Sequence, residues 1–224
     1  MCTLWRVTPP TTADEWTVLL ADCLDGVADR MGRARLGYLA ATGKVELQVR
    51  DELAFALHMV LADSPCQVCR EWPPGHRDLA VTGASGEPLM ELEAKALYDF
   101  DAASQTKRAQ FLAGGKSSHG LDVMKLVASV AAGTPCYLLS LVTNLCGSVP
   151  PGSLTAVKYS VAHNAALKAR GSWEGLAEAA QAWPVDLATL GPVAHAVEWD
   201  CEEVYGVPVS VTAYLVGPLE SRGV

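Results

Sequence analysis

Residues 76–101, HRDLAVTGASGEPLMELEAKALYDFD, contain two apolar runs separated by a turn rich in Gly, Ser and Pro. Such a pair of runs is typical of a β-hairpin. In the second run, residues 89–98, successive side chains of a strand point to opposite faces. Glu91, Glu93 and Lys95 therefore share one face. We expect that face either to meet water or to line a site.

Asp78, Glu93 and Lys95 form a set that suits metal-dependent chemistry. On paired strands, Asp78 and Glu93 could hold Mg²⁺, which typically binds one or two carboxylates together with waters and substrate phosphate. Lys95, two residues further on, could stabilise negative charge or position an attacking water. The alternative is a surface strand with an ordinary Glu/Lys pair, worth less than about 1 kcal/mol.

Asp78, a hairpin turn and then Glu93-Ala94-Lys95 in an apolar strand resemble the signature of the PD-(D/E)XK nuclease superfamily. The order helix, strand, strand, helix, strand over about residues 45–145 is also similar to the core of that superfamily. Arg77 stands where the motif has proline. The resemblance implies an α/β (α+β) fold with a restriction-endonuclease-like core. A mixed central sheet would be flanked by helices, and the C-terminal part would add a helical segment and a hairpin.

The resemblance also implies roles for individual residues. Asp78 and Glu93 would ligate Mg²⁺ or Mn²⁺, and the Ala94 carbonyl is a further candidate ligand. Lys95 would orient or activate the water that hydrolyses a phosphodiester bond.

A glutamate lies within the largely apolar helix that we expect over residues 45–62. A buried carboxylate is costly unless it is paired or metal-bound. The resemblance implies that this residue, Glu52, supports the metal directly or through water. The alternative is a boundary position beside Arg50 and Asp51.

The composition sets limits on partners. The chain has 224 residues, 50% of them hydrophobic, and a formal net charge of −8. This length fits a single domain, residues 1–224. The acidic balance counts against a tight, sequence-independent nucleic-acid binder, although a local basic patch or a metal ion could supply positive charge. The expected partner is nucleic acid, DNA in preference to RNA, or a small anionic substrate. A homodimer is a further option.

Seven cysteines and an N-terminus without the pattern of a secretory signal favour a reduced, cytoplasmic protein. No apolar run reaches the length of a membrane span. Cys66 and Cys69, with His76 downstream, have the first half of a zinc-site spacing, but the second half is missing. Loss of Met1 would expose Cys2, and some amidotransferases use such a cysteine as nucleophile. No partner pattern accompanies it.

The remaining periodicity predicts further elements. Lys125 could face the substrate, but water is the commoner environment for such a lysine, and Asp122 also points away from the apolar stripe of its helix. The turn over residues 114–117 could hold a phosphate through backbone N–H groups. We expect helices over residues 12–31, 104–113, 119–132, 153–169 and 172–183, a buried strand over 136–145 and a hairpin over 193–216.

Two classes of function follow. The first is a metal-dependent phosphodiesterase or nuclease. The second keeps the fold but changes the chemistry, giving a small-molecule biosynthetic enzyme or a non-catalytic binding protein, since fold does not fix function. An open cleft with lysines on its rim beside Asp78 and Glu93 favours the first class, and a closed apolar pocket favours the second.

Overall fold

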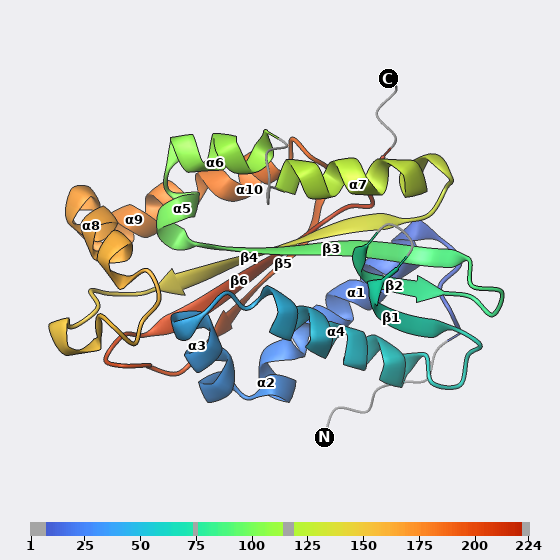
Figure 1. The fold of residues 1–224 in the computed structure, drawn as a ribbon, viewed down its shortest axis with the longest axis horizontal. Helices are drawn as coiled ribbons and strands as arrows, with labels where there is room; N and C mark the ends of the chain where they lie inside the picture. Colours follow the sequence, from blue (N-terminus) through green and yellow to red (C-terminus); the bar gives the residue numbers. More distant parts are fainter. Residues whose placement is uncertain (1–7, 74–75, 114–118, 221–224) are drawn as a thin grey trace.

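A six-stranded mixed sheet runs through the molecule in the order β1-β2-β3-β4-β6-β5 (Figure 1). The structure is a computed structural model that describes residues 8–73, 76–113 and 119–220. Strands β3 and β4 pair in parallel, and the other neighbours pair antiparallel. The predicted α/β fold with a mixed sheet between helices is confirmed. The strands are β1 Gln67–Trp72, β2 Arg77–Thr82, β3 Pro88–Tyr98, β4 Cys136–Leu145, β5 Val193–Asp200 and β6 Val209–Val216.

Helices cover both faces of the sheet (Figure 1). One face carries α1 Ala13–Asp25, α2 Val27–Met31, α3 Arg33–Thr42 and α4 Glu46–Val60. The other carries α5 Asp99–Ala102, α6 Gln105–Leu112, α7 His119–Ala131, α9 Trp173–Ala180 and α10 Ala182–Leu187. Helix α8, Ser160–Arg170, packs beside α5 and α9 after a short 3-10 turn, Pro151–Ser153. No helix among the described residues is long and apolar enough to cross a membrane.

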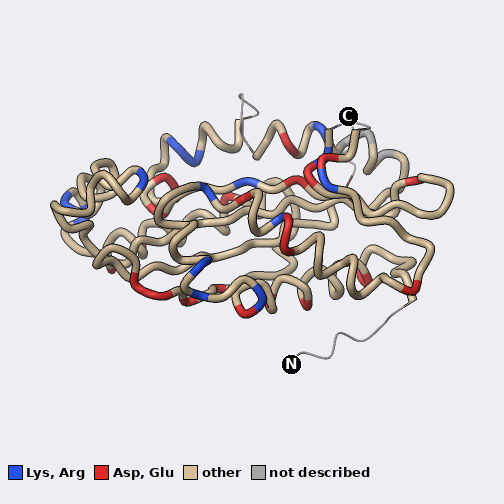
Figure 2. Tube along the Cα trace, turned by 60° about the horizontal axis from the view of Figure 1, so that its bottom comes forward, with Lys and Arg blue, Asp and Glu red and all other residues tan. Residues whose placement is uncertain are grey.

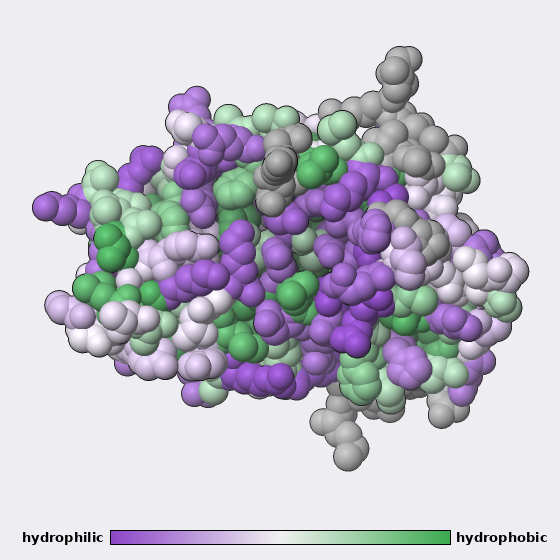
Figure 3. Space-filling model, viewed as in Figure 1, coloured by the Kyte–Doolittle hydropathy of each residue, from purple (hydrophilic) through white to green (hydrophobic). Residues whose placement is uncertain are grey.

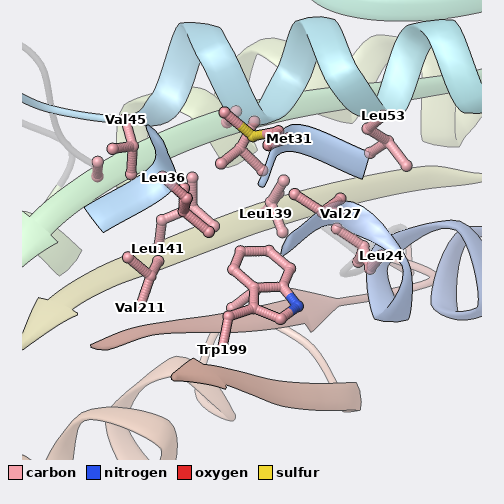
Figure 4. Close-up of a cluster of buried hydrophobic side chains, with 14 of the residues drawn as sticks. Leu24, Val27, Met31, Leu36, Val45, Leu53, Leu139, Leu141, Trp199 and Val211 are labelled. Atoms are coloured by element: carbon pink, nitrogen blue, oxygen red, sulfur yellow. The ribbon is translucent and has the colours of Figure 1, made fainter. Parts of the chain in front are cut away.

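Strand β4 lies inside the sheet, between β3 and β6, and every one of its residues is buried. A parallel strand that is covered on both faces reads as a continuous apolar run, and CYLLSLVTNL is such a run. Its side chains belong to two hydrophobic cores, one on each side of the sheet. In the larger core, the Trp199 ring of β5 meets Leu24, Val27 and Leu139 (Figure 4). This packing joins the predicted C-terminal hairpin, which is confirmed as β5 and β6, to the rest of the sheet.

Several predicted boundaries change. The helix expected over residues 12–31 begins with a capping box of Thr12 and Glu15 but breaks at Gly26, between α1 and α2. Glycine has a low helix propensity, which explains the break. The helix expected from residue 153 begins only at Ser160, after Tyr159 in a left-handed conformation.

Strand β1 was missed by the sequence prediction. It is an edge strand with largely exposed residues, QVCREW, and so lacks the alternation of apolar and polar residues that marks a half-buried strand. Three strands, β1, β2 and β3, therefore follow α4, where the sequence predicted two. The shorter α5 and α6 lie between β3 and α7.

Candidate active site

Strands β2 and β3 separate where the sequence places Asp78 and Glu93. The β2–β3 ladder ends at Leu79 opposite Leu92, so Asp78 and Glu93 occupy the next positions along the two strands. Beyond this point the N–H groups of β3 need other partners, and the Ala94 N–H donates to Asp78 Oδ2 at 2.8 Å. The predicted pair of carboxylates is therefore brought together, with Asp78 held by the backbone of the strand that carries Glu93.

Helix α4 contacts this part of β3 through Glu46 and not through Glu52. The Ala96 N–H donates to Glu46 Oε2 at 2.9 Å, two residues along β3 from the Asp78 contact. The Glu52 carboxylate lies instead 2.9 Å from Arg30 Nε, on α2. At 100° per residue, a side chain six positions after Glu46 points to a different side of the helix. The geometry therefore gives Glu52 no contact with the site.

The electrostatics of Glu93 are unusual. The side chain is buried, and its Oε1 has no hydrogen-bond donor among the described residues. Burial and the neighbouring Asp78 carboxylate raise the pKa of Glu93 to about 8. Without a cation, the pair therefore holds a proton at neutral pH. A divalent cation could replace that proton and satisfy the orphaned oxygen, which fits the Mg²⁺ or Mn²⁺ that the resemblance implies.

The face that carries Glu91, Glu93 and Lys95 does not meet water, because α7 packs over it. Both glutamates are buried, and the Lys95 side chain is only 17% exposed. Lys95 Nζ lies 3.1 Å from Asp122 Oδ2 of α7. Of the two alternatives for this face, water or a site, the structure excludes general exposure to water. The face forms a buried polar layer between the sheet and α7.

One residue of α7 was misplaced by the sequence prediction. Asp122 is 1% exposed and lies under the helix, although it was expected to point away. Lys125 is exposed, as expected, and it also reaches the site. Lys125 Nζ donates to Asp122 Oδ1 at 2.9 Å and lies 3.5 Å from Glu93 Oε2. The sequence held one indication of this contact. Asp122 and Lys125 lie three residues apart on a helix, and their charges complement those of Glu93 and Lys95 on the strand.

Arg77, which stands where the motif has proline, ties α7 to the strands. Its Nε lies 2.6 Å from Glu91 Oε2 in a buried ion pair, and its Nη2 donates to the Lys125 carbonyl at 2.6 Å. Two of its contacts thus fix the turn of α7 that presents Lys125 to Glu93. The departure from the motif has a structural role at the rim of the site.

A neutral histidine bounds the site on the β4 side. His119 Nε2 lies 3.0 Å from Ser140 Oγ, and the Trp183 indole N–H donates to the same hydroxyl at 3.1 Å. Ser140 pairs in register with Lys95. Burial, together with the charge of Lys95, lowers the pKa of His119 to about 3. The imidazole is therefore uncharged, and the positive charge on this side belongs to the lysines.

Hydrophilic side chains gather across the middle of the molecular face between α7 and α4 (Figure 3). Basic and acidic positions are interspersed along the described trace (Figure 2). Arg50 of α4 illustrates this mixing, because its guanidinium bonds Asp51 and Glu71 and lies 3.9 Å from Asp78 Oδ1. The positive charge near the carboxylates is thus largely compensated by acidic neighbours.

Other candidates from the sequence do not join this site. Cys66 and Cys69 lie at β1 as free thiols. Within the described ranges, no three His, Cys, Asp or Glu residues come together as a metal site, so Asp78 and Glu93 stand as a pair. Cys2 and the glycine-rich turn over residues 114–117 lie outside the described residues.

Comparisons with protein-family models, with curated proteins and with solved structures gave no match for this chain.

Proposed function

We propose that this chain is a Mg²⁺- or Mn²⁺-dependent phosphodiesterase of the nuclease type, with nucleic acid, DNA in preference to RNA, as its substrate. The observation that carries the proposal is the Asp78–Glu93 pair beside Lys95, in which Glu93 is buried and its Oε1 lacks a donor among the described residues. The elements from α4 to β4 contain the helix, strand, strand, helix, strand order expected of a restriction-endonuclease-like core, with β1, α5 and α6 in addition. The charged residues of the site and the order of the elements thus support the same proposal.

Each residue of the site has a separate role in the proposed reaction. Asp78, fixed by the Ala94 N–H, and Glu93, after loss of its proton, would hold the cation, with waters and substrate completing its shell. The bound cation would polarise a phosphoryl oxygen and lower the pKa of its water. Lys95 orients the attacking water and opposes the negative charge that develops on the phosphoryl group. Glu46 steadies β3 at Ala96.

The test is a titration of Mg²⁺ and Mn²⁺ against linear, circular and single-stranded DNA and RNA. Asp78→Asn and Lys95→Ala are compared with Asp186→Asn, which removes a carboxylate paired with Arg108 away from the site. We expect metal-dependent cleavage that both site variants abolish and the control retains. Cleavage that survives in Asp78→Asn, or a wild-type protein that binds neither cation, overturns the proposal.

A second candidate function is a small-molecule enzyme or a binding protein built on the same fold. The burial of Glu93 and Asp122 under α7 favours it, because a duplex needs an open groove. A separate hollow of about 440 Å³ lies on the same face of the sheet, lined in part by Asn144, Trp173 and Tyr214. Cation binding that Asp78→Asn abolishes, without cleavage of any nucleic acid, would favour this candidate.

A further inference from the structure

Helix α7 places a carboxylate between two ammonium groups. Asp122 Oδ1 accepts a hydrogen bond from Lys125 at 2.9 Å, and its Oδ2 lies 3.1 Å from Lys95 Nζ. The two lysines come from different elements, α7 and β3. Because Asp122 is 1% exposed, its negative charge is directed to these lysines and not to water. The carboxylate therefore couples the position of the helix lysine to that of the strand lysine.

Burial of this carboxylate is costly. Removing an ion from water costs several kcal/mol, and an apolar residue of similar volume often stabilises a fold equally well. The next turn of α7 provides such a residue, Leu126, which is fully buried against the sheet. Stability alone therefore does not account for Asp122. Its two partners differ in another respect, since 37% of the Lys125 side chain and 17% of the Lys95 side chain remain exposed.

The two contacts also differ in kind. Lys125 is aligned for a hydrogen bond with Asp122. Lys95 is close enough for an ion pair, but Asp122 Oδ2 has no aligned donor among the described residues. An ammonium group has three donors, so Lys95 can face Asp122 with one N–H and point the others at a water or at a phosphoryl oxygen. Asp122 thus restrains the charge of Lys95 without occupying all of its donors.

We propose that Asp122 is a positioning residue that holds Lys95 and Lys125 as a pair of cations beside Asp78 and Glu93, and that both ammonium groups contact one anionic phosphoryl group of the substrate. The proposal rests on the proposed function and adds Lys125 to the residues that touch substrate. Lys125 reaches the site through Glu93 Oε2 at 3.5 Å. It would give up that contact when a cation takes its place.

The decisive variant is Asp122→Asn, with Asp186→Asn as the matched control. The first readout is the NMR relaxation of the lysine ammonium groups in protein with labelled lysine, assigned with Lys95→Arg and Lys125→Arg. We expect both ammonium groups to be more mobile in Asp122→Asn than in wild type, because the carboxylate that holds them is gone. The control should leave the mobility of both groups unchanged.

The second readout is the cleavage rate at saturating Mn²⁺. We expect Asp122→Asn to lower the rate about 100-fold, whereas its Mn²⁺ affinity should change less than about threefold. Identical mobility of both lysine ammonium groups in the variant and wild type overturns the role of Asp122, whatever the cleavage assay gives. If wild type neither binds Mn²⁺ nor cleaves, the proposed function fails, while the lysine mobility still decides whether Asp122 positions the pair.

A second variant guards against loss of folding in Asp122→Asn. Lys125→Gln leaves Asp122 in place and gives it Lys95 as its remaining ammonium partner. We expect the Lys95 ammonium group to stay as restrained as in wild type, because Asp122 still holds it. A Lys95 ammonium group that is as mobile in folded Lys125→Gln as in Asp122→Asn contradicts the proposal.

Discussion

Replacing Glu93 by Gln should stabilise the metal-free protein at neutral pH and leave it nearly unchanged at pH 5. Gln has the shape of the protonated acid but does not titrate. The pKa of Glu93 is about 8 in the folded protein, against an ordinary value of 4.5, because of burial and the Asp78 carboxylate. Between these two values the folded state holds a proton that the unfolded state has lost.

The size of the effect follows from proton linkage. A raised pKa in the folded state means that the stability contributed by this group is fully present below about pH 4.5 and is lost as the pH rises towards 8. One bound proton corresponds to about 1.4 kcal/mol per pH unit. Between pH 5.5 and 7.5 wild type should lose about 3 kcal/mol relative to Glu93→Gln. For a chain of this size, that corresponds to roughly 6–12 °C in melting temperature.

The assay is urea denaturation in EDTA at half-unit steps from pH 5 to 8, with Glu178→Gln on the surface as control. Titrating groups away from Glu93 are shared by the two proteins and cancel in the difference. Adding Mn²⁺ at pH 7.5 should raise the stability of wild type and have a much smaller effect on Glu93→Gln, because binding to the folded state alone stabilises it. A difference between the two proteins that is flat across this pH range would refute the electrostatic argument for Glu93.

Three further outcomes are expected. Glu52→Gln should cost less than about 1 kcal/mol in urea denaturation, since a partly exposed ion pair is weak, and should leave Mn²⁺ affinity unchanged in calorimetry. Arg77→Met should cost about 3–5 kcal/mol by leaving Glu91 buried and unpaired, and replacing Glu91 by Leu as well should recover most of that loss. Burial alone would lower the pKa of His163, but the hydrogen bond and charge of Asp99 raise it above 6.5. The stability that His163 contributes should therefore be present below about pH 6.5 and decline above it, so that His163→Gln costs less at pH 9 than at pH 6 in thermal denaturation.

The hairpin and the central strand could be predicted because their signals are local. Alternation in β3 assigns Glu91, Glu93 and Lys95 to one face, and the structure confirms that arrangement. The proximity of Asp78 to Glu93 follows from the hairpin register, which is set by a short turn. These inferences need only the period of a strand and the position of one turn.

The remainder of the site depends on how helices dock on the sheet, which no local pattern encodes. Asp122 and Lys125 look like the solvated side of an amphipathic helix, because a polar stripe that faces water and one that faces buried charges have the same spacing. The choice between Glu46 and Glu52 has the same origin. Both lie on α4, and only the rotation of that helix against β3 brings the first to Ala96 and the second to α2.

The buried charged groups of this chain differ in how completely they are satisfied, and that contrast separates structural from functional residues. The Asp99 carboxylate accepts hydrogen bonds from the N–H groups of Phe100 and Leu145 and faces His163. By contrast, Glu93 Oε1 is a buried carboxyl oxygen without a donor, and Asp122 Oδ2 faces the Lys95 ammonium group at 3.1 Å without an aligned hydrogen bond. The other orphaned atoms among the described residues belong to neutral groups. A buried acidic group that is incompletely satisfied is costly, and both of these acidic groups lie within reach of Lys125. A fold that satisfies Asp99 fully would have little reason to leave these two groups incomplete unless a cation, a proton or a substrate group completes them.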